Sequence, residues 1–177
     1  MSQLAFHQLV ARGLLKNFLV PVDTTEDYIH FIINNDTFAA DIVMAGFEPE
    51  PNYQALRVSF WFCHIDGQRM NFSGIPHDDL LFLCHKLSSS TEWGMLSPTQ
   101  FDEDSVHISV YACLDTDTED IESMNKLDFE SRLLRGLMRL CREVEMLYPA
   151  LYGVVTAQIR DLTHLQKFLS EEEEVSH

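Results

Sequence analysis

The chain has 177 residues, of which 46% are hydrophobic, so it is long enough for one ordinary domain with its own core. Its 28 acidic and 12 basic residues give a net charge of −16, which repels nucleic acids and anionic membranes. No apolar run approaches the roughly 20 residues that span a bilayer, and the first residues lack the pattern of a secretion signal. We therefore expect a cytoplasmic protein with free cysteines.

The first part of the chain predicts a helix followed by three strands. Residues 3–18 carry apolar side chains at helical spacing. Strands are expected over 28–33 and 37–47, and the prolines of "EPEPN" should break the second, because proline cannot donate to a ladder. The stretch 56–65, "LRVSFWFCHI", is apolar on both faces, which indicates a central strand.

The second part predicts a helix, two strands and a long closing helix. Residues 77–88 form the helix, the strand at 92–101 is irregular, and 106–114 alternates cleanly between apolar and polar positions. The long helix should span 128–148, where Pro149 kinks or ends it. Strands joined by short turns favour an antiparallel sheet of about five strands with helices on one face, hence the α+β class.

The domain organisation follows from these elements. We expect one α+β domain over residues 1–148, a C-terminal extension over 149–170 that is helical, and an acidic disordered tail over 171–177. Residues 115–126 are acidic and are expected to form a loop.

Two adjacent Cys-His pairs, Cys63-His64 and Cys84-His85, raise the question of a zinc site or a reactive thiol. Neighbouring residues diverge on a strand and on a helix, so neither pair can aim both side chains at one metal. The pairs lie in apolar stretches, which favours buried structural cysteines over a thiolate nucleophile. The same reading applies to Cys113 and Cys141, and the chain contains no recognised catalytic motif. We therefore predict no metal, no cofactor and no enzyme activity, although a thiol enzyme or small hydrolase is the rival that this reading must exclude.

The order of elements, in a small acidic chain, resembles the class I chaperones of type III secretion and the YbjN-like families that share their fold. The resemblance runs from about Leu4 to Tyr148 and rests on four stretches: "GIPHDDLLFLCHKL", "FDEDS", "VHISVYACL" and "LDFESRLLRGLMRLCREVEMLY". It implies the order α-β-β-β-α-β-β-α and a homodimer without catalytic chemistry. It also implies a chaperone or adaptor that holds a segment of a partner, such as a secreted effector, often by strand addition. The alternative is a YbjN-like regulatory module in signalling or stress response.

Two groups of residues are predicted to contact other proteins. Apolar side chains outside the core stripes predict a dimer interface formed by Leu81, Phe82, Trp93, Met95, Tyr111 and Cys113. The apolar central strand and a basic ridge on the long helix predict a partner-binding surface that includes Phe60, Trp61, Phe62, Arg132, Arg135 and Arg139. The alternative is that the long helix and the C-terminal extension cover the apolar residues within the monomer.

Overall fold

The fold is described from a computed structural model, which covers residues 3–15, 21–50, 53–102, 104–116, 126–157 and 159–175. In chain order the elements are α1 (Gln3–Leu15), β1 (Asp23–Thr24), β2 (Ile29–Asn34), β3 (Ala39–Glu50), β4 (Tyr53–Cys63), α2 (His77–Ser88), β5 (Met95–Asp102), β6 (Ser105–Thr116), α4 (Lys126–Thr156) and α5 (Leu162–Val175). The α+β class predicted from the sequence is confirmed. The sheet has six antiparallel strands, because the two-residue β1 pairs with the edge of β2.

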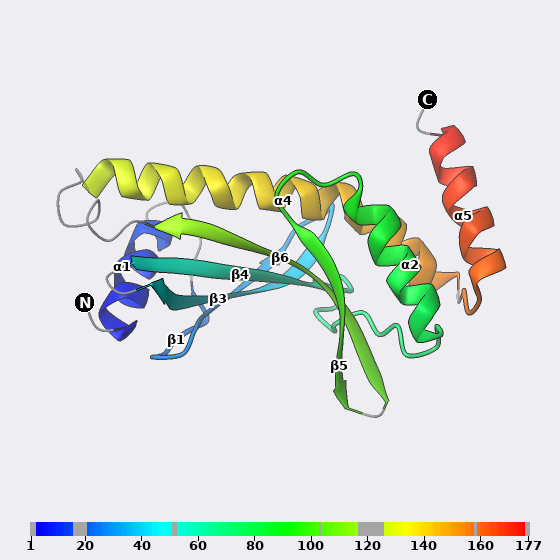
Figure 1. The fold of residues 1–177 in the computed structure, drawn as a ribbon, viewed down its shortest axis with the longest axis horizontal. Coiled ribbons are helices and arrows are strands. Elements are labelled where there is room, and N and C mark those ends of the chain that lie inside the picture. The colour runs from blue at the N-terminus through cyan, green and yellow to red at the C-terminus, as the bar shows by residue number, and fades with distance from the viewer. Residues whose placement is uncertain are drawn as a thin grey trace.

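The strand order is β1-β2-β3-β4-β6-β5. The first four strands follow one another as a meander. The chain then leaves the sheet through α2, returns at the far edge as β5, and inserts β6 between β5 and β4. This crossover brings α2 against β5, so a helix and an edge strand meet at one end of the sheet (Figure 1).

One face of the sheet is covered by helices. In Figure 1, α4 lies along this face, α1 sits beneath its first turns, and α2 and α5 lie at its other end. Seven buried apolar side chains of α4 recur at alternating steps of four and three, which places them in one stripe toward the sheet: Leu133, Leu137, Leu140, Val144, Leu147, Leu151 and Val154. They meet alternate residues of the strands, among them Phe60, Phe62 and Val110. Each such side chain contributes about 1.5–3 kcal/mol by leaving water.

A buried histidine joins α1 to the sheet. His7 is 0% exposed, and its ring reaches two backbone groups. The Gly46 backbone N–H donates to Nε2 at 2.8 Å, so Nδ1 carries the proton and donates to the Thr25 carbonyl at 2.9 Å. The neutral ring therefore connects α1 with β3 and with the turn before β2.

The opposite face is the open face of the sheet, and among the described residues it carries no helix (Figure 1). The strand register arranges its side chains in rows, one of which reads Met95, Tyr111, Ser59, Val43 and His30, and the next Ser97, Ser109, Trp61, Asp41 and Ile32. The Arg69 Nε donates to the Asp41 carboxylate at 2.8 Å, and the Arg69 guanidinium lies over the Trp61 ring. Antiparallel sheets commonly have one face of this mixed composition in contact with water.

The long helix differs from its prediction. The helix α4 passes through Pro149 and ends at Thr156, so the boundary predicted after residue 148 falls inside one helix. A proline inside a helix costs about 3 kcal/mol. The buried stripe continues on both sides of it with Leu147 and Leu151, and packing of these side chains against the core outweighs that cost.

Two further boundaries also differ. The strand β3 continues to Glu50 despite the prolines of "EPEPN", because a register irregularity between Phe47 and Glu50 accommodates Pro49 near the hairpin end. The helix α5 runs to Val175 and so includes most of the tail predicted to be disordered. Its Leu165 and Leu169 are buried in the core and hold the helix against the rest of the protein. Residues 176–177 and most of the acidic loop, residues 117–125, lie outside the described residues.

Candidate protein-binding surface

Four of the residues predicted to form a dimer interface lie on α2, in the loop that follows it and at the first residue of β5. We call them the α2–β5 patch: Leu81, Phe82, Trp93 and Met95, with exposed fractions of 46, 36, 46 and 59%. The helix α2 buries Leu80, Leu83 and Cys84, so the two residues between these positions face outward. All four side chains are exposed by more than a third, and their place in a dimer interface stays a prediction.

A buried carboxylate holds the backbone beneath Trp93. Glu143 of α4 is 5% exposed and accepts three backbone N–H groups, from Glu92, Trp93 and Gly94, each at 2.8 Å. Three hydrogen bonds to one buried charge fix this loop far more firmly than exposed loops usually are. The exposed indole therefore projects from a rigid backbone.

The residue that follows the tryptophan must be glycine for this arrangement to exist. A Cβ at Gly94 would lie 2.3 Å from the Val110 side chain and 3.0 Å from the Glu143 carboxylate. The distance to Val110 is too short for any side chain and the distance to Glu143 is tight, so the close approach of loop, strand and carboxylate depends on the missing Cβ.

Trp93 also contacts the basic ridge. The Arg139 guanidinium lies 4.9 Å from the centre of the indole ring, within the range of a cation–π interaction. One predicted partner-binding residue and one predicted interface residue thus touch each other. The contact leaves the ring 46% exposed.

The free edge of β5 is poorly suited to strand addition, the binding mode that the family resemblance implies. Backbone groups of Leu96, Pro98 and Gln100 face the same edge, because an antiparallel ladder alternates. The Leu96 N–H already donates to Ser88 Oγ at 3.1 Å, and proline has no N–H. An added strand would find one free donor along these three positions, so a partner at this edge would have to be bound mainly by side chains.

Tyr111 and Cys113, predicted with the interface, line a shallow groove on the open face. The groove has a volume of about 350 Å³ and is lined by Arg57, Ser59, Trp61, Ser97, Thr99, Ser109, Tyr111 and Cys113. Tyr111 is directly opposite Met95 in the β5–β6 ladder, so the groove adjoins the α2–β5 patch. The lining offers hydroxyls, one guanidinium and one thiol, and contains neither histidine nor carboxylate. The lining therefore lacks the histidine or carboxylate that usually activates a hydroxyl or thiol nucleophile.

The prediction that Phe60 and Phe62 bind a partner is wrong for this structure. They are 0 and 1% exposed and lie under α4, whereas Trp61 between them is half-buried on the open face. Alternation along β4 separates them. The strand is apolar on both faces because it is central, with β3 and β6 on its two sides.

The cysteines behave as structural groups where they are buried. Burial raises the pKa of the Cys63 thiol to about 11, with a further contribution from the Asp41 charge, and burial raises the pKa of Cys84 to about 12. The pKa of Cys141 is raised to about 11 by burial and by Glu145. These thiols are protonated at neutral pH and are therefore poor nucleophiles. Among the described residues, no group of three or more His, Cys, Asp or Glu side chains is placed to bind a metal ion.

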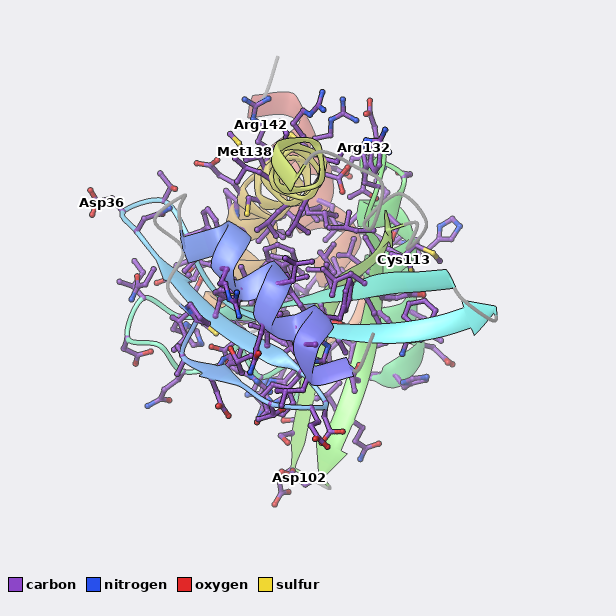
Figure 2. The ribbon with its side chains drawn as sticks, turned by 90° about the vertical axis from the view of Figure 1, so that its left-hand side faces the viewer. Asp36, Asp102, Cys113, Arg132, Met138 and Arg142 are labelled. Carbon is purple, nitrogen blue, oxygen red and sulfur yellow. The ribbon has the colours of Figure 1, made fainter. Side chains whose placement is uncertain are left out.

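The predicted arginines lie on the outer side of α4. Arg132, Arg135 and Arg139 are exposed, and Arg142 continues their line. Figure 2, which views α4 nearly end on, shows Arg132, Met138 and Arg142 projecting from the helix on the side away from the sheet.

Sequence reasoning missed the residues that hold the surface in place, above all Glu143 and Gly94. A signal for Glu143 does exist: it is an acid adjoining the buried stripe of α4, next to Val144 and three residues after Leu140. Its partners are backbone groups about 50 positions away, and no pattern in the sequence identifies them.

Comparison of the chain with known protein families, with curated proteins and with solved structures found no match. The resemblance to secretion chaperones and YbjN-like families therefore stays a prediction. No helix in the described part of the chain is both long enough and apolar enough to cross a bilayer.

Proposed function

We propose that the protein is a non-catalytic, cytoplasmic adaptor that binds other proteins, and that two copies pair through the α2–β5 patch. The observation that carries the proposal is the rigid presentation of Trp93 by Glu143. Tryptophan is enriched among residues that dominate binding energy. A side chain that is already ordered before binding loses less entropy on association.

The chemistry of the exposed surface supports a binding role over an enzyme role. The groove lacks a base, and the three partly or fully buried thiols are protonated. A chaperone that holds a partner segment and a regulatory adaptor both need an exposed apolar surface in a defined position. The α2–β5 patch is such a surface in both cases.

Pairing of two copies suits a patch that is small and apolar. A two-fold axis places the same surface on both subunits, so Leu81 and Phe82 of each copy can cover those of the other. A stable pair needs to bury about 800 Å² per chain, which requires neighbouring side chains of α2 and the β5–β6 hairpin in addition to the four.

The test is the mass in solution of the wild type and of Leu81→Glu, measured by light scattering at about 100 μM, well above the dissociation constants of ordinary complexes. We expect the wild type to be dimeric and the variant monomeric with unchanged circular dichroism. Ile65→Glu is the matched control, since Ile65 is 59% exposed and lies outside the patch; it should remain dimeric. A wild type that is monomeric at this concentration rejects the pairing.

A further inference from the structure

The outward side of α4 carries a second surface with a different character. We call it the arginine–methionine face: Arg132, Arg135, Met138, Arg139, Arg142 and Met146. The arginines follow one another at steps of three, four and three, so they form one line along the helix. The two methionines are 50 and 65% exposed. From Arg132 to Met146 the face is about 21 Å long at the helical rise of about 1.5 Å per residue.

Two arginines of this face, Arg135 and Arg142, are not neutralised by a carboxylate in the described part of the chain. The Arg135 Nε donates to the carbonyl of Ser131 in its own helix at 3.3 Å. Neither Arg135 nor Arg142 has a described carboxylate within ion-pair distance. The two acids of this part of α4 point elsewhere: Glu143 is buried, and Glu145 accepts a hydrogen bond from Thr37 Oγ1.

An ordinary solvated helix face would look different. Such a face mixes both signs of charge, often four residues apart, because opposite charges stabilise each other. Here a chain with 28 acids and 12 bases places four of those bases in one line and adds two exposed methionines. Arginine and methionine are both enriched at protein interfaces, and methionine adapts to varied apolar partners.

We infer that the arginine–methionine face binds an acidic segment of another protein, in which carboxylates alternate with apolar side chains. The carboxylates pair with the line of arginines in bidentate fashion, and the apolar residues cover Met138 and Met146. Nucleic acid offers the same negative charge, but the net charge of −16 repels a polyanion of that length. The inference rests on the proposed adaptor role and adds the chemistry of the partner.

The experiment selects displayed random 16-residue peptides on the wild type, with counter-selection on the double variant Arg135→Glu/Arg142→Glu. We expect the enriched peptides to be acidic with interspersed apolar residues, to bind the wild type, and to bind the double variant about tenfold more weakly or worse. Arg139 is left unchanged because it contacts Trp93. The matched control is Arg12→Glu/Arg160→Glu, two exposed arginines outside α4 with the same change in charge; it should retain binding.

A further variant separates the apolar contribution to peptide binding from the contribution of charge. Met138→Ala/Met146→Ala should weaken the selected peptides while leaving the slope of affinity against salt unchanged, because the removed contact is apolar. Folding of every variant is checked by circular dichroism.

The inference is overturned if no acidic peptide is enriched, if the double variant and the control bind equally well, or if a single-stranded RNA of the same length competes more strongly than the peptides. A second copy of this chain as the ligand would appear as loss of the dimer in the double variant, which likewise overturns it. Failure of the Leu81→Glu test would leave the peptide-binding outcomes unaffected.

Discussion

The two faces of the sheet use similar residue types for opposite purposes. On the covered face, aromatic and aliphatic side chains such as Phe60 and Val110 are completely buried under α4. On the open face, Trp61 and Tyr111 remain partly exposed among serines and threonines, and an arginine lies over the Trp61 ring. Hydrophobicity alone therefore does not tell which face of a central strand supports the core and which faces water.

The largest expected contrast is between neighbours on β4. Phe60→Ala should lower the free energy of unfolding by about 3–5 kcal/mol, because it removes a fully buried ring and leaves a cavity. Trp61→Ala should lower the free energy of unfolding by clearly less, since Trp61 is only half-buried. Urea unfolding of both variants measures the difference. Equal losses would show that the open face contributes to the core as much as the covered face does.

A smaller contrast concerns two glutamates of α4. Glu143→Ala should lower the free energy of unfolding by about 2–4 kcal/mol, because three backbone N–H groups lose their acceptor in a buried setting. Glu145→Ala, the exposed control, should stay within about 0.5 kcal/mol. The first variant should also increase hydrogen exchange at residues 92–94. Unchanged exchange there would mean that the carboxylate does not fix the loop under Trp93.

The smallest contrast is one of pH dependence. The folded pKa of Cys84, about 12, exceeds its ordinary value of 9.0, so folding favours the protonated thiol. Its contribution to stability is complete below pH 9 and is lost as the pH rises toward 12, at about 1.4 kcal/mol per pH unit. Unfolding measured between pH 8 and 11 should therefore show a shallower decline in Cys84→Ala than in the wild type. Identical slopes in the two proteins would contradict burial of the Cys84 thiol.

Local patterns predicted much of this fold. The bounds of α2 match residues 77–88, and the alternation over 106–114 located β6, because each pattern reports one face turned to the core. Pro149 misled the prediction because its local cost is opposed by packing at positions before and after it. Exposed residues such as Leu81 could be anticipated from their place outside the buried stripe of α2.

The supporting residues of the site could not be anticipated in the same way. The role of Glu143 depends on a loop from another part of the chain, and that of Gly94 depends on the distance between a strand and a helix. Likewise, the assignment of Phe60 and Phe62 to a binding surface failed because the side that α4 covers is decided by the topology. Periodicity separates the two faces of a strand without telling which one is covered.

The edge of β5 has few free backbone donors, and this bears on whether association of copies stops or continues. Backbone pairing propagates, since each added strand offers a new edge to the next. At β5 the Leu96 donor is taken by Ser88 and Pro98 supplies none, so association at this end of the molecule depends on side chains. A contact between side chains about a two-fold axis is complete when two copies have paired, because the same surface is then buried on both. The pairing that we propose would therefore close at two copies and would not extend into a fibre.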